Sequence, residues 1–212
     1  MDSKSILEGV KEALEKAKKR NFKESVELAI NLKDVDLSNP KNRINEEIVL
    51  PKGRGKPVKV ALFAGDELAY KAKDVADLVI PGEEIPDLGE DKKRAKQLAN
   101  EYDFFLAETT YMPLVGKHLG VVLGPRGKMP KPIPPSADPR PLIENLRKMV
   151  RARSKDRPTF HVPVGVRDMP PEEIAQNIEA VLSRIISKLE RGEMNIRSAY
   201  VKTTMGPAVR IL

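Results

Sequence analysis

The sequence contains no cysteine and no tryptophan, and its only histidines are His118 and His161. Without cysteine the chain can form no disulfide, no thiolate nucleophile and no cysteine-based zinc site. Two separate histidines exclude histidine-rich metal sites and paired-histidine catalysis. No apolar run approaches the roughly 20 residues that a membrane-spanning helix needs, and the charged N-terminus is unlike a secretory signal. We expect a cytoplasmic protein without a membrane, a metal or a cofactor.

Positive charge is concentrated at the two ends of the chain. The 212 residues include 38 basic and 31 acidic ones, giving a net charge of +7. Residues 1–58 and 152–212 each have three more basic than acidic residues, whereas residues 59–151 have only one more. A net positive charge favours a polyanionic partner, such as RNA. The charge distribution predicts that the two ends provide most of the affinity.

The two ends also share a pattern of half-buried elements. Residues 25–32 (SVELAINL) alternate apolar and polar side chains, which is typical of a strand with one buried face. Residues 4–20 carry an apolar stripe with helical spacing. After residue 151 come a strand near 157–165, a long amphipathic helix from about 168 to 192, and two strands separated by a Gly-Pro turn. These elements predict an α+β domain.

The middle of the chain has a different pattern. The runs VKVALFA, DLVIP and DFFLAE are short and almost continuously apolar, and helical stretches near 66–76 and 91–102 separate them. Further helices are expected near 112–122 and 140–149. This alternation is typical of an α/β sheet that is covered on both faces. We predict an α/β domain of residues 59–151, inserted into a split α+β domain of residues 1–58 plus 152–212.

The loop GVVLGPRGKMP, residues 120–130, resembles a phosphate-binding loop but lacks its spacing. Val122 and Met129 stand where a Walker motif needs glycine and then serine or threonine. The cations Arg126 and Lys128 could contact an RNA phosphate, or the loop could simply end a helix. Gly65 stands alone after a strand, so a dinucleotide fingerprint is absent. A nucleotide-dependent enzyme stays open as an alternative because of the α/β pattern.

Residues 203–206, TTMG, have side chains suited to RNA sugars and bases. The hydroxyls of Thr203 and Thr204 can exchange hydrogen bonds with ribose 2′-hydroxyls, Met205 offers an apolar surface, and Gly206 permits close approach. The same four residues could also be an ordinary strand end.

For three other residues, an RNA contact and an ordinary structural or solvated position are both open. Phe22 could stack on a base or begin a core, and Glu27 could accept hydrogen bonds from 2′-hydroxyls or be merely solvated. His161 is expected to face outward on its strand, towards RNA or solvent.

Four stretches, NFKESVEL, LPKGRGKP, LVGKHLGVVLGPRGKMPKP and YVKTTMGPAVRI, together closely resemble the universal large-subunit ribosomal protein L-one family in its archaeal form. The resemblance covers essentially the whole chain. It implies a non-enzymatic protein with a Rossmann-like three-layer inserted domain and a split RNA-binding domain. It also implies binding to the mobile stalk of ribosomal RNA, assistance in releasing exit-site tRNA, repression of its own mRNA, and a monomeric free state.

The resemblance assigns the principal RNA contacts residue by residue. Ser25 stands where many relatives have threonine, so the hydroxyl is kept and the methyl is lost. His161 becomes a stronger candidate, and Lys117, Arg126 and Lys128 are secondary ones. A general basic chaperone for nucleic acid is a further alternative, which predicts no preference for the stalk. The principal contacts implied by the family are Phe22, Ser25, Glu27, Thr204, Met205 and Gly206.

Overall fold

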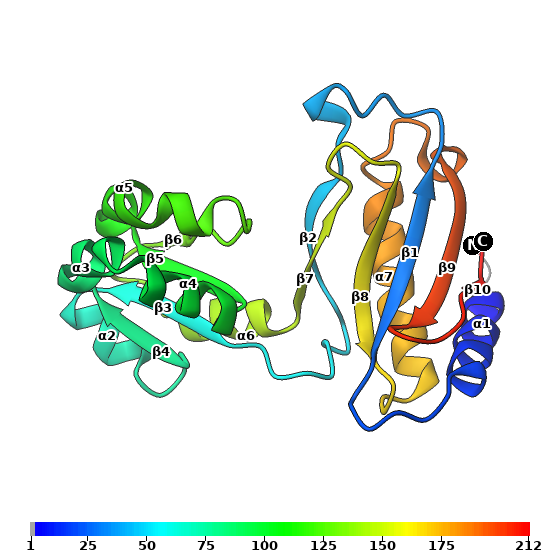
Figure 1. Ribbon diagram of the computed structural model, residues 1–212, viewed down its shortest axis with the longest axis horizontal. Coiled ribbons are helices and arrows are strands. Elements are labelled where there is room, and N and C mark those ends of the chain that lie inside the picture. The colour runs from blue at the N-terminus through cyan, green and yellow to red at the C-terminus, as the bar shows by residue number, and fades with distance from the viewer. Residues whose placement is uncertain (1–2) are drawn as a thin grey trace. The chain divides into compact units, whose positions relative to one another are not determined.

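The computed structural model describes residues 3–212, which form two compact units (Figure 1). The terminal unit consists of the chain up to Lys56 together with Lys148–Leu212, and the inserted unit is Pro57–Arg147. Among residues 3–212, no helix is long and apolar enough to cross a membrane. The mixed α/β architecture predicted from the sequence is confirmed.

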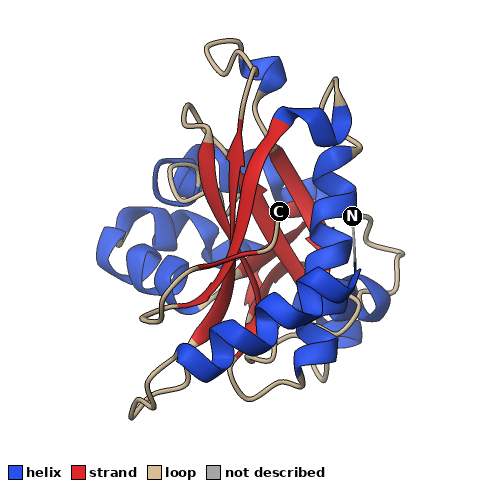
Figure 2. Ribbon diagram, turned by 90° about the vertical axis from the view of Figure 1, so that its right-hand side faces the viewer, coloured by secondary structure: helices blue, strands red, loops and turns tan. Residues whose placement is uncertain are grey.

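The terminal unit is built on one antiparallel sheet with strand order β10-β9-β1-β8. Two helices, α1 (Ser3–Lys16) and α7 (Pro171–Ile186), pack on the sheet, as Figure 2 shows. The helix predicted over residues 4–20 ends earlier than expected, at Lys16. The strands are β1 (Ser25–Leu32), β8 (Thr159–Val166), β9 (Ile196–Thr203) and β10 (Val209–Arg210).

The alternation in β1 places its two kinds of side chain on opposite faces of the sheet. Val26, Leu28 and Ile30 are fully buried in the core that includes the apolar stripes of α1 and α7. The intervening residues, including Glu27 and Asn31, therefore lie on the face away from this core. This open face carries the side chains discussed below.

A second, two-stranded sheet in the terminal unit joins β2 (Asn45–Val49) to β7 (Met149–Arg153). Residues 149–151 were predicted to belong to the inserted domain, whereas here they pair with β2 as part of the terminal unit. Val150 pairs with Ile48 across the two strands, and both side chains are buried in the core of the terminal unit. Long-range pairing, which local pattern does not reveal, decides where this strand belongs.

The inserted unit has a four-stranded parallel sheet in the order β4-β3-β5-β6. Its edge strand β6 was not predicted, because it is only three residues long and contains Pro132, which an edge position tolerates. The strands are β3 (Val60–Ala64), β4 (Leu78–Pro81), β5 (Phe104–Glu108) and β6 (Lys131–Ile133). The helices are α2 (Asp66–Ala72), α3 (Ile85–Glu90), α4 (Lys92–Glu101), α5 (Met112–Leu123) and α6 (Arg140–Arg147).

Helices cover both faces of this parallel sheet. Phe63 and Phe105 point to one face, where their rings stack at 6.1 Å and pack with the buried residues of α3, α4 and α5. Leu62 and Leu106 alternate with them and are fully buried on the other face, while α2 and α6 contact β3. The two covered faces explain the continuously apolar strands.

We expect Phe63→Ala to destabilise the inserted unit by about 3–5 kcal/mol, because it opens a cavity in a packed aromatic pair. Denaturant unfolding followed by circular dichroism measures this loss. Tyr70→Ala is the matched control, since the Tyr70 side chain in the same unit is 84% exposed. Equal stability of the two variants would contradict the described core.

Candidate nucleic-acid interface

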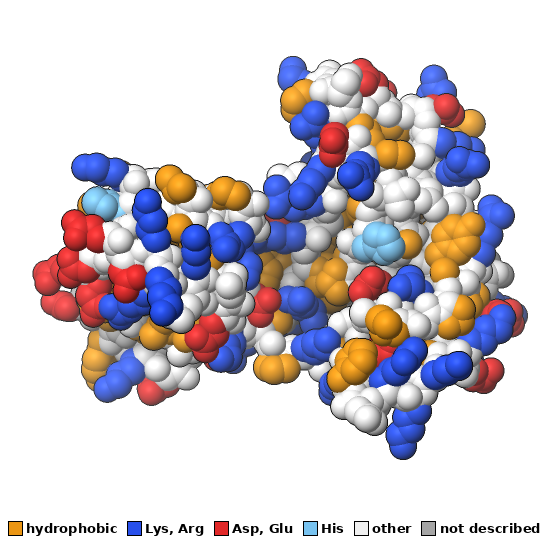
Figure 3. All heavy atoms as spheres, in the orientation of Figure 1, with side chains coloured by type: hydrophobic (Ala, Val, Ile, Leu, Met, Phe, Trp, Pro, Cys, Tyr) orange, Lys and Arg blue, Asp and Glu red, His pale blue; other side chains and the backbone are white. Residues whose placement is uncertain are grey.

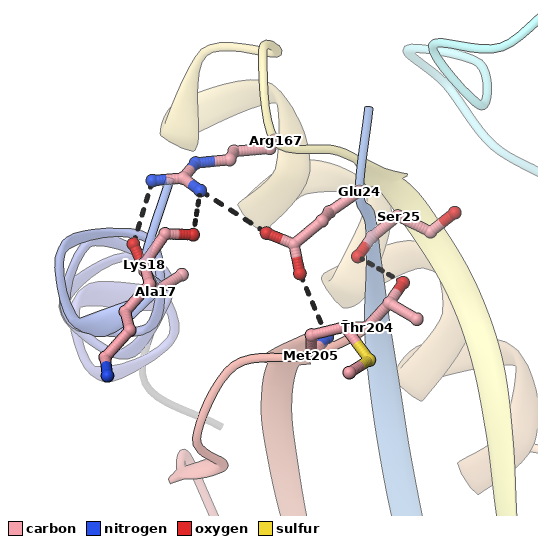
Figure 4. Close-up of polar contacts among 7 residues, drawn as sticks. All are labelled: Ala17, Lys18, Glu24, Ser25, Arg167, Thr204 and Met205. Carbon is pink, nitrogen blue, oxygen red and sulfur yellow. Dashed lines mark hydrogen bonds and ion pairs between the residues drawn. The ribbon is translucent and has the colours of Figure 1, made fainter. Parts of the chain in front are cut away.

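The TTMG turn is hydrogen-bonded to the start of β1, as Figure 4 shows. The Thr204 N–H donates to the Ser25 carbonyl at 3.0 Å, and the Thr204 hydroxyl donates to the same oxygen at 3.3 Å. The Gly206 N–H closes the turn on the Thr203 carbonyl at 3.1 Å. The two stretches that the sequence singled out, NFKESVEL and TTMG, therefore form one surface, the TTMG surface, although about 180 residues separate them.

The buried carboxylate of Glu24 holds this turn through the Met205 backbone. Glu24 is only 1% exposed. Its Oε1 accepts a hydrogen bond from the Met205 N–H at 3.0 Å, and its Oε2 lies 3.3 Å from Nη1 of Arg167. A buried charge is tolerated only when it is paired and hydrogen-bonded. Glu24 meets both conditions: Arg167 pairs with its charge, and the Met205 N–H donates a hydrogen bond to it. The same hydrogen bond holds the Met205 backbone in place.

Arg167 extends the same network to the end of α1 (Figure 4). Its guanidinium donates to the carbonyls of Lys18 at 2.7 Å and Ala17 at 2.8 Å. The backbone N–H of Arg167 donates to the backbone carbonyl of Glu24 at 3.0 Å. Carbonyls at a helix C-terminus lack partners within the helix. Arg167 satisfies such carbonyls just after α1 and ties this segment to Glu24. Neither Glu24 nor Arg167 was predicted.

Two large apolar side chains near the turn are exposed. Phe22 is 56% exposed and Met205 is 60% exposed, although apolar burial usually stabilises a domain. Ser25 and Glu27, in the same NFKESVEL stretch as Phe22, add a hydroxyl and a carboxylate. An apolar surface beside hydroxyl and carboxylate acceptors suits a ribose or an unstacked base, which present one apolar face and several polar edges.

Cationic groups surround these residues in the terminal unit. Lys56 Nζ donates to the Ser25 hydroxyl oxygen at 2.7 Å, and Lys202 Nζ donates to the Thr204 carbonyl at 2.9 Å. His161 Nδ1 lies 3.7 Å from Glu27 Oε2 on the open face of the sheet, where Figure 3 shows a histidine over β1 and β8. The predicted outward direction of His161 agrees with its exposed side chain.

The basic turn PKGRGKP, residues 51–57, is held against β8 by one buried amide. Asn177 is fully buried, and its Oδ1 accepts from the Lys52 N–H at 3.0 Å. Its Nδ2 donates to the carbonyls of Gly53 and Val164 at 2.9 and 2.8 Å. Gly53 has φ +70°, a conformation that favours glycine. The sequence showed the basic turn but gave no sign that Asn177 anchors it.

Thr203 and Gly206 are both packed against other parts of the turn. Thr203 is fully buried, and its hydroxyl is the one buried side-chain polar atom of residues 3–212 without a hydrogen-bond partner. A direct sugar contact by this hydroxyl does not fit that position. A Cβ at Gly206 would collide with the Thr203 hydroxyl and lie 3.3 Å from Ala17. Internal packing alone therefore already requires glycine at position 206.

The loop of residues 120–130 has mainly internal roles. Lys128 Nζ donates to the carbonyls of Ala99 and Tyr102, both at 2.8 Å, and so caps the C-terminus of α4. This use of its ammonium group argues against the expected RNA contact. Arg126 donates to the Val122 carbonyl at 3.0 Å but stays exposed, as does Lys117. The loop ends α5, with Gly127 at φ +66°.

The place where an α/β sheet usually binds a nucleotide is filled by the protein itself. Strand order reverses between β3 and β5, and ligands bind beyond the carboxyl ends of strands at such a point. There the Glu108 carboxylate, 8% exposed, accepts from the Gly65 N–H at 2.8 Å and from the Thr110 hydroxyl at 2.7 Å. A fixed negative charge at the start of α2 repels a phosphate. Within residues 3–212, no cluster of His, Asp or Glu side chains is arranged to hold a metal.

Comparison with known proteins identifies the family. Residues 14–207 match the Ribosomal protein L1p/L10e family. A protein named large ribosomal subunit protein uL1 from Methanocella arvoryzae is 57% identical, with the whole of both chains covered. Its namesake from Thermoplasma acidophilum is 59% identical over all of this chain and 97% of its own length. The namesake from Methanothermobacter thermautotrophicus is 51% identical over 98% of each chain.

The matching relatives define a class of structural ribosomal proteins rather than enzymes. The chain belongs to the Ribosomal protein L1p/L10e family, and the resemblance to its archaeal members is confirmed. Because the family is non-enzymatic, the nucleotide-dependent enzyme considered from the sequence is excluded.

We expect Glu24→Ala to destabilise the terminal unit by about 2 kcal/mol, because it leaves the Met205 N–H and Arg167 without their buried partner. Glu24→Gln should cost about half as much, since an amide oxygen still accepts from Met205. Glu27→Ala, three residues further along in β1, is the control: its contact with the half-exposed His161 should contribute under about 0.5 kcal/mol. Chemical denaturation compares the three variants. Equal stability of Glu24→Ala and Glu27→Ala would contradict the role given to Glu24.

Proposed function

We propose that the chain is a structural protein of the large ribosomal subunit that binds the mobile stalk of ribosomal RNA through its terminal unit. The observation that supports this most strongly is the TTMG turn, which Glu24 holds rigidly while Met205 and Phe22 remain exposed. A preorganised surface loses little conformational freedom when it binds. A ligand that covers these two apolar side chains would remove their surface from water, which is favourable.

Each exposed residue has a chemical role in this proposal. Met205 and Phe22 cover the faces of a ribose or an unstacked base. Glu27 accepts hydrogen bonds from 2′-hydroxyls, because a carboxylate has acceptors only and repels phosphates. Ser25 and Thr204 offer hydroxyl oxygens, although each already has a protein partner. Gly206 shapes the turn, and the buried Thr203 supports it without touching RNA.

Cations beside the turn are suited to the RNA backbone. Lys56 and Lys202 lie at the Ser25 hydroxyl and the Thr204 carbonyl, where they can also approach phosphates. Contacts to phosphates position a protein, whereas sugars and base edges provide the discrimination. His161 belongs to the same open face and adds a ring donor or acceptor. Lys117 and Arg126, on the inserted unit, remain secondary candidates because both are exposed.

The resemblance to the family extends the proposal to the working ribosome. As a stalk protein, the chain assists the release of deacylated tRNA from the exit site. It also represses translation of its own mRNA by binding an RNA fold similar to the ribosomal site, and it is a monomer when free. Recognition through shape and sugar hydroxyls supports this double use, because two RNAs of different sequence can present the same surface. Its place is the cytoplasmic ribosome.

A general nucleic-acid chaperone fits the structure less well. Such a protein needs only diffuse positive charge. The candidate interface instead combines a carboxylate, hydroxyls and two apolar side chains at fixed positions. This composition favours one RNA shape over others.

We expect Met205→Asp to weaken binding to stalk RNA more than tenfold, or by about 1.4 kcal/mol or more, because it replaces an apolar contact with a charge that repels phosphate. A filter-binding titration at fixed salt measures the dissociation constant. Met194→Asp is the matched control, since Met194 is 73% exposed in the same unit and lies outside the TTMG surface. Both variants should unfold at the same denaturant concentration as the unmodified protein.

Two results would contradict the proposal. Met205→Asp could bind stalk RNA as tightly as Met194→Asp does, which would make the turn a mere strand connection. Alternatively, the unmodified protein could bind stalk RNA and an unrelated duplex equally at every salt concentration, as a general chaperone would.

A further inference from the structure

A second basic site lies in the terminal unit, at the start of the β2–β7 ribbon. It is a hollow of about 400 Å³. Three of its lining residues are cationic, Arg43, Arg153 and Lys155, and no acidic residue lines it. Figure 3 shows basic side chains gathered over the upper parts of β2 and β7. The remaining lining residues are Pro40, Ile44 and Asn45.

Two of these cationic side chains have no partner among the described residues. The side chains of Arg153 and Lys155 form no hydrogen bond or ion pair with any residue in the described range 3–212. Arg151, two positions earlier on the same strand, instead pairs with Glu47 at 3.2 Å, and Arg184 pairs with Glu46 at 2.8 Å. The carboxylates of β2 thus neutralise neighbouring arginines and leave the hollow positively charged.

The surroundings hold the hollow in a defined shape. Arg43 donates to the carbonyls of Leu37 at 2.8 Å and Ser38 at 3.3 Å, which fixes its guanidinium. Ser154, 3% exposed, exchanges hydrogen bonds with the backbone of Ile44, both at 3.0 Å. Like charges held close together repel each other. An anion bound between them would relieve this repulsion.

The hollow lies in the segments that join β1 to β2 and β7 to β8, at the end of the β1–β8 ladder opposite the TTMG surface. Ser25 pairs with Val166 at one end of the β1–β8 ladder, and Asn31 pairs with Thr159 at the other. Lys155 precedes Thr159 by four residues. The ladder between these ends measures about 20 Å along β1, at roughly 3.3 Å per residue.

The open face between these two ends is polar and uninterrupted by a helix. It carries Glu27 and His161 in its middle. At its far end the Thr159 hydroxyl donates to the Asn31 side-chain oxygen at 2.7 Å. An RNA that lies along β1 from the turn therefore meets acceptor groups first and the cationic hollow last.

We propose that this hollow binds a backbone phosphate of the same RNA, as a second anchoring point remote from the TTMG surface. The proposal rests on the RNA-binding function proposed above and adds to it a phosphodiester site at Arg43, Arg153 and Lys155. Arg43 is preorganised, while Arg153 and Lys155 supply unneutralised charge. The phosphate site adds affinity and fixes the position of the RNA along the protein. The TTMG surface distinguishes stalk RNA from other RNAs.

The test is a double variant, Arg153→Gln with Lys155→Asn, titrated against stalk RNA at several salt concentrations. Asparagine suits position 155 because the backbone there has φ +51°. Removing phosphate contacts should weaken binding about fivefold and reduce the slope of log affinity against log salt by about 1–2. The preference for stalk RNA over an unrelated duplex should persist. Lys92→Gln with Lys96→Gln, on α4 of the inserted unit, removes the same charge as a control.

The outcomes separate this inference from the proposed function. A double variant with the same salt slope and affinity as the α4 control overturns the phosphate site, while an intact preference of the unmodified protein for stalk RNA leaves the proposed function standing. A protein without that preference overturns the proposed function and this site with it. A reduced slope together with a shortened protection of the RNA backbone in chemical footprinting supports the second anchor.

Discussion

Glu24 is a carboxylate removed almost entirely from water, and the shape of the candidate interface depends on how its charge is balanced. Arg167 supplies the opposite charge, and the Met205 N–H supplies a hydrogen bond. The same arginine holds the chain after α1. One ion pair therefore joins three segments that are distant in sequence. Because an unpaired buried charge is costly, the turn is held in a single arrangement, with Met205 directed outward.

The two units use their polar groups differently. In the inserted unit, Glu108 occupies the site that a nucleotide would take, and Lys128 caps a helix, so groups that look ligand-binding in the sequence are used internally. In the terminal unit, Phe22 and Met205 stay exposed, and no described carboxylate pairs with Arg153 or Lys155. The α/β pattern of the inserted unit indicates a fold but not a nucleotide site, since the chemistry depends on what occupies the crevice.

Sequence pattern predicted the features that neighbouring residues determine by themselves, such as a strand with one buried face. The alternation of residues 25–32 matches β1 from end to end, and the glycine spacing of residues 120–130 argued against a nucleotide loop in a segment that ends α5. Contacts between distant residues were invisible: Glu24 looked like any solvated acid beside a strand, and Asn177 looked like any polar residue on an amphipathic helix. Both are buried because partners more than 100 residues away satisfy them. The burial of Thr203 was invisible for the same reason, since its neighbours on β1 and at Gly206 enclose it.

The most direct test of this account is hydrogen exchange of the backbone amides, measured on the full chain with and without stalk RNA. If the turn fixed by Glu24 is the RNA-binding surface, RNA should slow exchange in residues 22–27 and 203–206, and leave the Gly65 and Thr110 amides of the inserted unit unchanged. Protection confined to the crevice beyond β3 and β5, with no change around Met205, would contradict it.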